Sequence, residues 1–512
     1  MKKARFHTYK IIPAAIILLA AAAVAARLLM APDVAQNRLY VPPDAGKPTL
    51  YGAGYLTTDP VTYILDAQNE LIGNYPGLNT SSQLLFGITA SGILGAGDQA
   101  RAVDPYSVSL PSSYDGRAKG FVSAVANQQG TRLCWDFSTI SSIETYMLLH
   151  NASSASTYSQ ANMAYALSNS VSTLGFARAV ADGGNFEMAM AYATRWQGPV
   201  LYSADPFSPD IGKISRTEAQ NDKPAALHVQ GYQQIPYNYD DIKNAIMKYG
   251  SVVSSIYVDA REEANQTSPI YNKATSSHYD YTAHVPNHQI QIVGWINSYP
   301  ASKFSTDPGM NGAWIVKSSW GTDFGDSGYF YISYNDVETC KNMYAVSDIE
   351  PVGNYDNIYL YDPFGQTAYV NYNDDTAWYA NTFTPKKTGE TLQAVAFYSE
   401  NNDTSYQIYY GTSLGGKKAL IAQGRVANVG YYTVPLAAPV QLSASPFTIF
   451  VKISTTSGIA DIPLETNVPN YITTAVSSPG GCFISADGTD WADITKIIPK
   501  SNICVRAFTS NS

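Results

Sequence analysis

The hydrophobic pattern of this chain changes character near Asn354. From Leu110 to about Pro351, stretches with a helical period and stretches with alternating apolar residues follow one another. Beyond Asn354 only short alternating runs separated by turn residues remain, at residues 392–398, 405–410, 447–453 and 502–508. The first region predicts an α+β domain and the second an all-β sandwich of jelly-roll type.

Length supports two folded units, because 512 residues exceed one ordinary domain and the 45% hydrophobic content is enough for real cores. We expect an export segment over residues 1–30, a linker or pro-segment over 31–106, the α+β domain over 107–351 and the sandwich over 354–512. The second of these is rich in Pro, Gly, Ser and Thr and has no sustained helical period.

The N-terminus carries the localisation signal. Four basic residues among the first ten precede an uncharged apolar run over residues 11–26, which is typical of an export signal. Ala23-Val24-Ala25 fits a cleavage site, but the apolar residues 28–30 extend the run toward the roughly 20 residues that span a bilayer. A cleaved signal peptide and a single transmembrane anchor therefore remain as alternatives, and both predict an extracellular or cell-surface protein.

Charge and cysteine spacing exclude several classes of partner. With a net charge of −9 and no basic stripe, nucleic acid is not an expected partner. The four cysteines have no zinc-ligand spacing, so we expect neither a metal nor another cofactor. Cys340 is expected to be a buried thiol. Cys482 and Cys504 lie in strand-like segments and are either thiols or one disulfide in an oxidising exterior.

Residues 127–133 form a Gly-containing loop that leads into a helical pattern, so the loop delivers Cys134 to a helix N-terminus. There the helix dipole favours the thiolate, and a neighbouring imidazolium would lower the pKa of the thiol further. Gln128 can place its side-chain amide beside the backbone N–H of Cys134, where both would stabilise an oxyanion. This pattern is typical of a nucleophilic cysteine.

His288 begins an alternating strand over residues 287–295 and follows Cys134 by 154 residues. That separation is close to the roughly 130–150 residues expected between such a nucleophile and its base. Residues 312–321 and 325–332 then predict a strand, a turn and a second strand.

Taken in order, these motifs resemble the papain family of cysteine peptidases. The matching positions are Leu110 to Asp115, Asn127-Gln128, Cys134-Trp135, Asn287-His288 and Trp314 to Tyr331. The resemblance implies a two-lobed papain-like domain and an endopeptidase acting on peptides or proteins, with Cys134 as nucleophile and His288 as base. It also implies that Gly183 and Gly184 line the substrate and that Trp320 shields His288 from water.

Three further segments resemble those of exported prokaryotic papain-like proteins that carry a lectin-like sandwich behind the peptidase domain. They are Trp196 to Val200, Ile358 to Asp362 and Phe483 to Trp491. "Lectin-like" describes a shape, so a carbohydrate or another cell-surface ligand is an open expectation. Aromatic residues near Asp487 either stack on sugars or finish a hairpin.

Two positions depart from the family pattern. Ser318 stands where the family usually has the Asn that orients the histidine; a serine hydroxyl accepts a hydrogen bond too, but it is shorter. We expect a slower but active enzyme, because the nucleophile, base and oxyanion donors remain. Thr131 stands where the family has a disulfide cysteine, so packing must hold the loop.

Ser318 also keeps a second class of function open: a weakly active or inactive papain-fold protein that binds or adheres at the cell surface. A narrower hypothesis is that the segment before the domain covers the cleft until it is removed.

Overall fold

The computed structural model describes residues 49–50, 56–57, 85–88, 110–150, 156–456 and 458–511. The chain divides into two compact units, residues 1–46 and 47–512, and the second holds everything described below. The expected export segment lies outside the described residues. Within the ranges just given, no helix is both long enough and apolar enough to cross a bilayer.

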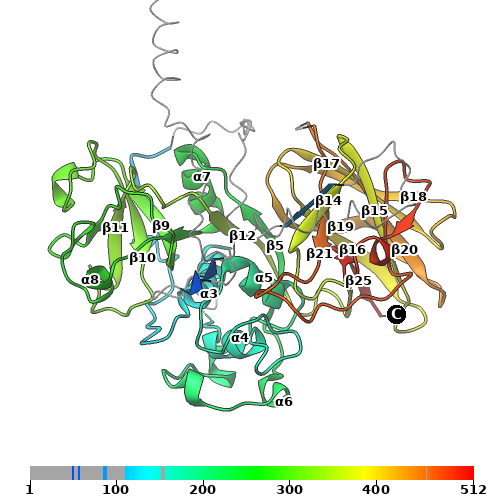
Figure 1. Cartoon of the computed structure of the whole chain (residues 1–512), viewed down its shortest axis with the longest axis horizontal. Coiled ribbons are helices and arrows are strands. Elements are labelled where there is room, and N and C mark those ends of the chain that lie inside the picture. Colours follow the sequence, from blue (N-terminus) through cyan, green and yellow to red (C-terminus); the bar gives the residue numbers. More distant parts are fainter. Residues whose placement is uncertain are drawn as a thin grey trace, which may run out of the picture. The chain divides into compact units, whose positions relative to one another are not determined.

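The helices of the α+β region follow their sequence signals. The longest, α3, runs from Cys134 to His150 and is buried over its first 13 residues. α7 (Tyr239–Tyr249) confirms the helix expected there. Asn238 caps its start by accepting from two backbone N–H groups, and Gly250, with φ of 91°, ends it. The others are α4 (Gln160–Ala166), α5 (Phe186–Thr194), α6 (Glu218–Asn221) and α8 (Ala260–Glu263) (Figure 1).

The strands of this region form one twisted, largely antiparallel sheet. They are β4 (Ser113–Asp115), β5 (Leu227–Gln234), β6 (Val252–Ile256), β7 (Tyr271–Asn272), β8 (Ser277–His278), β9 (His288–Ile296), β10 (Ala313–Lys317), β11 (Tyr329–Ser333) and β12 (Met343–Pro351). Their order is β5-β12-β6-β9-β10-β11-β8-β7, with β4 also on β9. The predicted strand, turn and strand are confirmed as β10 and β11, which pair from Ala313 opposite Ser333 to Lys317 opposite Tyr329.

Beyond residue 354 the regular secondary structure of the described chain consists of strands, apart from the short 3-10 helix Ile494–Lys496, as predicted. One sheet has the order β18-β17-β20-β15-β22-β23. Its strands are Ala419–Val426, Thr404–Gly411, Phe447–Ser454, Thr376–Phe383, Cys482–Ser485 and Ala492–Asp493. The other strands are β13 (Asn357–Tyr359), β14 (Ala368–Asn371), β16 (Thr391–Ser399), β19 (Gly430–Gln441), β21 (Ile462–Glu465), β24 (Asn502–Ile503) and β25 (Val505–Ser510).

A single sheet runs through both regions. β19 of the all-β region pairs antiparallel with β5 of the α+β region, with Gly430 opposite Gln233. A Cβ on Gly430 would lie 2.2 Å from the backbone oxygen of Tyr232, so only glycine allows the two strands to approach this closely. The resulting 13-stranded sheet extends from β13 to β7.

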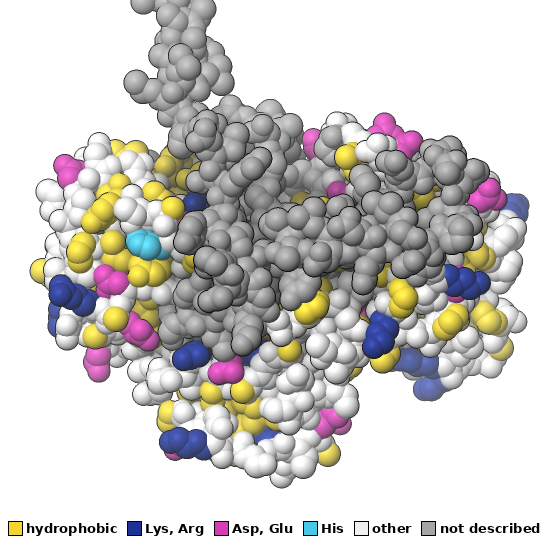
Figure 2. All heavy atoms as spheres, viewed as in Figure 1, with side chains coloured by type: hydrophobic (Ala, Val, Ile, Leu, Met, Phe, Trp, Pro, Cys, Tyr) yellow, Lys and Arg dark blue, Asp and Glu magenta, His cyan; other side chains and the backbone are white. Residues whose placement is uncertain are grey.

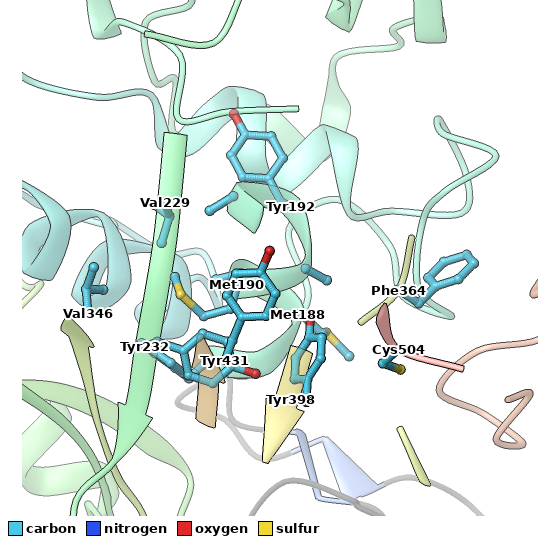
Figure 3. Packing of buried hydrophobic residues seen from close by; sticks show 14 of the residues in the cluster. Met188, Met190, Tyr192, Val229, Tyr232, Val346, Phe364, Tyr398, Tyr431 and Cys504 are labelled. Carbon is cyan, nitrogen blue, oxygen red and sulfur yellow. The ribbon is translucent and has the colours of Figure 1, made fainter. Parts of the chain in front are cut away.

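The hydrophobic core is also shared. Met188 and Met190 of α5 and Tyr232 of β5 belong to the same buried cluster as Tyr398 and Tyr431 of the all-β region (Figure 3). The ring of Tyr431 lies 6.2 Å from that of Tyr232 and 4.9 Å from that of Tyr398. The two regions are therefore joined by side-chain packing as well as by backbone hydrogen bonds.

The segment expected as an irregular linker contributes three short strands. β1 (Thr49–Leu50) and β2 (Leu56–Thr57) pair with each other. β3 (Leu85–Ile88) pairs antiparallel with β14, with Ile88 opposite Ala368, and forms the edge of the sheet β24-β21-β14-β3. The rest of this segment lies outside the described residues.

The cysteines and the surface complete the fold. Cys340 is buried as expected, and Cys482 and Cys504 are both buried thiols rather than a disulfide. On the face seen in Figure 2, the visible Lys and Arg side chains occur singly or in small groups, some of them beside Asp or Glu side chains.

Candidate active site

Cys134 is the first residue of α3, as the sequence predicts. Leu133 accepts from the backbone N–H groups of Asp136 and Phe137, both at 3.0 Å, and so starts the first turn of the helix. The preceding turn is closed by Thr131, whose hydroxyl donates to the Gln128 backbone oxygen at 2.6 Å. A hydrogen bond from Arg132 N to Ala181 O, 3.0 Å long, ties this loop to the segment that contains Gly183 and Gly184.

The pKa of the Cys134 thiol differs in direction from the prediction. Burial of the whole residue raises it to about 12, although hydrogen bonds from the backbone N–H groups of Gln289, Trp135 and Cys134 itself act to lower it. Removing the sulfur from water disfavours the thiolate by more than the helix terminus favours it. In this arrangement the thiolate depends on a proton acceptor within the site.

His288 is the first residue of β9 and is completely buried. Asn287 clamps the chain just before it, since its side chain both accepts from and donates to the backbone of Val258, at 2.9 Å in each case. The imidazole lies against Trp320, with ring centroids 4.3 Å apart and planes inclined by 26°. Because the backbone N–H of Gln289 reaches the Cys134 sulfur, the start of β9 and the start of α3 meet.

Gln128 is buried, and both ends of its amide are held. Its Oε1 accepts from the Ser319 hydroxyl at 2.6 Å, and its Nε2 donates to Thr131 O at 2.8 Å. A backbone hydrogen bond of 2.7 Å from Gln128 N to Ser319 O brings this segment beside the one that holds Trp320. An amide nitrogen has two hydrogens, so Nε2 retains one for a further acceptor.

Ser318 follows β10 and is buried, and its Oγ accepts from the Trp320 backbone N–H at 3.0 Å. It lines a cavity of about 20 Å³, together with Ser319, Gln289 and Lys317. That volume admits one water molecule. The structure thus places Ser318 beside Trp320 with unfilled space next to its short side chain.

The cavity adjoins a buried lysine that the sequence analysis missed. Lys317 Nζ donates to the hydroxyls of Ser123 and Ser141, at 2.9 and 2.6 Å. Burial lowers the pKa of Lys317 to about 8, and the charge of Glu144 acts in the opposite direction. The sequence did contain a signal for a buried polar partner: Ser141 and Glu144 lie about one turn apart, on the same face of the helix.

Gly183 and Gly184 lie just before α5, against the residue that follows the nucleophile. A Cβ on Gly184 would fall 2.6 Å from Cε2 of Trp135, so the backbone at this position sits directly on the indole. The Trp135 Nε1 donates to Asp182 O at 3.4 Å. The two glycines and Cys134 are therefore neighbours through Trp135.

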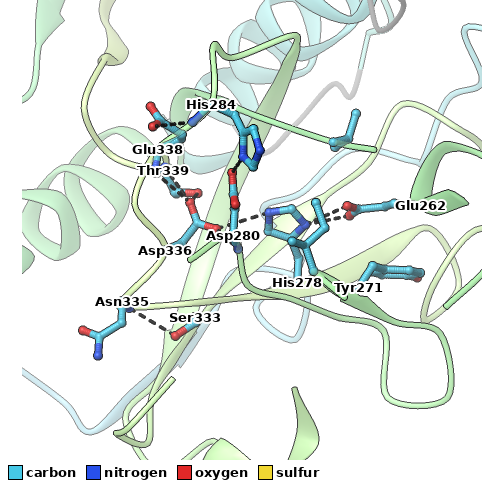
Figure 4. Close-up of polar contacts among 12 residues, drawn as sticks. Glu262, Tyr271, His278, Asp280, His284, Ser333, Asn335, Asp336, Glu338 and Thr339 are labelled. Atoms are coloured by element: carbon cyan, nitrogen blue, oxygen red, sulfur yellow. Dashed lines mark hydrogen bonds and ion pairs between the residues drawn. The ribbon is translucent and has the colours of Figure 1, made fainter. Parts of the chain in front are cut away.

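A second buried histidine, His278, was also missed. Its Nδ1 lies 2.8 Å from a Glu262 oxygen and its Nε2 3.2 Å from an Asp336 oxygen (Figure 4). Burial acts against the charged ring, but the two carboxylates outweigh it and raise the pKa of His278 well above its usual value. Periodicity gives no signal for this cluster, because its members come from three separate segments.

Comparison with known proteins identifies both regions. Residues 110–348 match the family described as papain family cysteine protease, and residues 358–509 match the lectin like domain. This chain joins a papain-family domain to a lectin-like domain. A papain-family domain implies that the substrates are proteins.

Curated relatives of the papain-family domain include three plant and animal proteases. Cathepsin K of Gallus gallus is 27% identical over 279 residues, covering 53% of this chain and 74% of the relative. Cathepsin S of Bos taurus is 28% identical over 45% of this chain and 62% of its own length. Senescence-specific cysteine protease SAG12 of Arabidopsis thaliana is 24% identical, over 44% and 56%. The chain spans less than two thirds of the last two relatives.

Two solved structures share the whole papain-family and lectin-like arrangement. The cysteine protease and lectin-like domains of Cwp84, a surface layer associated protein of Clostridium difficile, have a TM-score of 0.71 at 22% identity, covering 92% of this chain and 99% of that one. Cwp84 after propeptide cleavage gives 0.70 at 24% identity, covering 78% and 100%. These likenesses confirm the predicted fold class.

Proposed function

We propose that this chain is a cysteine-type endopeptidase that hydrolyses peptide bonds in proteins through an acyl-enzyme. The observation that carries the proposal is the meeting of α3 and β9, which puts Cys134 next to the residue that follows His288. The papain-family match over residues 110–348 supports the same chemistry.

The proposed reaction begins when the Cys134 thiol gives its proton to the His288 imidazole and the sulfur attacks the substrate carbonyl carbon. The oxyanion that forms accepts hydrogen bonds from the Cys134 backbone N–H and from the remaining N–H of Gln128 Nε2. As the C–N bond breaks, the His288 imidazolium protonates the leaving amine. Water, deprotonated by His288, then attacks the thioester and releases the acid and the thiol.

In this proposal Trp320 covers the imidazole, and Ser318 contributes to its orientation directly or through a water in the adjoining cavity. Gly183 and Gly184 line the substrate, and backbone without side chains suits an extended peptide. We also propose the domain bounds 107–351 and 354–512, with the segment 31–106 as a removable pro-segment.

The test is hydrolysis of a mixed fluorogenic peptide library under reducing conditions, with residues 31–512 and with a form trimmed to residues 107–512. Cys134→Ala is expected to abolish cleavage. Cys340→Ala removes another buried thiol and serves as the matched control, because it is expected to keep activity. Absence of cleavage by both wild-type forms would contradict the proposal.

Ser318 favours a second candidate, a cell-surface binding protein in which the papain fold is a scaffold. A thiol-reactive peptide probe separates the two: labelling that disappears in both Cys134→Ala and His288→Ala supports the peptidase. If the probe does not label the protein, carbohydrate or another surface ligand would be sought for the lectin-like domain.

In that domain the ring centroids of Trp491 and Phe450 lie 5.3 Å apart. This packing favours the hairpin role for the residues near Asp487.

We propose a cell-surface or extracellular location. The printed description of Cwp84 as surface layer associated supports it, as does the apolar run near the N-terminus. N-terminal sequencing of the protein recovered from cell-surface and culture fractions would show whether residues 1–30 are removed or retained as an anchor.

A further inference from the structure

Arg178 is a buried cation outside the proposed catalytic set. It lies in the segment that leads to Gly183 and Gly184, and only 5% of its surface is exposed. A buried guanidinium is costly unless its N–H groups are satisfied. What it binds is therefore informative about its role.

All hydrogen bonds of the Arg178 guanidinium go to backbone oxygens. Nε donates to Gly183 O at 3.0 Å, while Nη2 donates to Val180 O at 2.8 Å and Asp182 O at 2.6 Å. Nη1 donates to Ala164 O at 3.0 Å, near the end of α4. Three of the four acceptors thus belong to the turn that carries the paired glycines.

The same guanidinium is stacked against the nucleophile's neighbour. Its central carbon lies 4.7 Å from the centroid of the Trp135 ring, the ring on which Gly184 rests. Arg178 and Trp135 therefore both hold the turn: Arg178 by hydrogen bonds, and Trp135 by its contact with Gly184 and its hydrogen bond to Asp182 O. Burial of the guanidinium lowers the pKa of Arg178 to about 10, and Asp136 and Asp182 act in the opposite direction.

We propose that Arg178 is the positioning residue for the substrate-lining turn of residues 180–184. Its hydrogen bonds fix the backbone of the turn, and its stacking on Trp135 holds the turn against the residue that follows Cys134. This inference rests on the proposed function, because it concerns how an extended peptide is held for attack by Cys134.

The reason for expecting a selective effect is geometric. The rate at which an extended substrate is attacked depends on the position of the glycine turn that it contacts, and a shift of about 1 Å costs on the order of 10²-fold in rate. A small activated ester such as 4-nitrophenyl acetate does not reach the turn. Its hydrolysis reports on Cys134, His288 and the oxyanion donors alone.

The experiment compares wild type, Arg178→Met and Arg178→Lys on both substrates. We expect Arg178→Met to lower kcat/KM for an extended peptide by about 10²-fold and to change ester hydrolysis by less than about threefold. Arg178→Lys keeps the charge and stem but offers a single donor centre, so we expect a loss of about tenfold on the peptide. It also keeps the test available if the methionine variant does not fold.

The matched control is Arg195→Met, which also removes a guanidinium only 7% exposed but one bound to Gln197 and Pro363. It is expected to lower stability and to leave the ratio of peptide to ester activity unchanged. An unchanged ratio in folded Arg178→Met, or wild-type peptide kinetics in Arg178→Lys, would overturn the inference. If the wild-type protein hydrolyses neither the peptide nor the ester, the proposed function is overturned instead.

Discussion

Two completely buried histidines lie ten residues apart in the papain-family domain, and their surroundings are opposite in kind. His278 is held between the carboxylates of Glu262 and Asp336, at 2.8 and 3.2 Å. His288, the first residue of β9, is stacked on the indole of Trp320, close to the start of α3. Carboxylates on both sides favour the charged form of a ring, whereas a proton shuttle must exist in both forms. The neighbours, rather than burial, separate a structural histidine from the proposed base.

The sharpest test of this contrast is activity. We expect His288→Ala to lower kcat/KM for peptides by about 10⁴-fold, because the thiol loses its proton acceptor. His278→Gln is expected to stay within about threefold of wild type per folded molecule. Steady-state assays, normalised by active-site titration for the variants that can be titrated, measure both. Equal losses in the two variants would break the distinction.

For the free energy of unfolding we expect the reverse order, with a larger loss in His278→Gln than in His288→Ala. His278→Gln leaves Glu262 and Asp336 buried without the cation, and breaking a buried ion pair in this way costs about 3–5 kcal/mol. Urea denaturation at neutral pH measures the free energy of unfolding. His284→Gln is the control, since its 2.8 Å contact with Asp280 involves a side chain that is 38% exposed. There the expected cost is at most about 1 kcal/mol.

The pH dependence of that difference tests the charge on His278. Its folded pKa is raised well above the usual value by Glu262 and Asp336, against the effect of burial. The stabilisation is therefore fully present below the unfolded pKa of about 6.5 and is lost as pH rises toward the folded value. We expect the difference between wild type and His278→Gln to shrink by about 1.4 kcal/mol per pH unit above that point. A difference that stays constant from neutral to alkaline pH would show that His278 is neutral in the folded protein.

The smallest effect concerns the orientation of His288. Ser318→Asn introduces a longer acceptor beside a cavity of about 20 Å³, so we expect it to fit and to raise kcat about threefold. Ser318→Ala, which removes the hydroxyl without adding volume, is the matched comparison and is expected to be slower than wild type. If asparagine and alanine have the same effect, this position does not orient the base.

Local pattern was sufficient for much of the molecule. The helix starting at Cys134, the capped helix over residues 239–249 and the paired strands β10 and β11 each carry their own periodicity and turn residues. The order of the motifs also pointed to the correct fold class. These features depend on residues close together in sequence.

Tertiary contacts explain what the sequence could not show. The pKa of Cys134 depends on complete burial, which the helix pattern does not reveal. Glu262, His278 and Asp336 meet only after folding, as do Arg178 and Trp135. The strand β3 was hidden in a segment whose composition resembles a linker.

The sheet that continues from β5 into β19 changes what the connection at residues 352–356 means. Because strand pairing and a common core already join the two regions, that short stretch of chain is not their only attachment. Cutting it would yield a two-chain complex rather than two separate proteins. The lectin-like region is thus fixed to the papain-family region, so a surface ligand bound by the first would hold Cys134 of the second at a constant orientation to that surface.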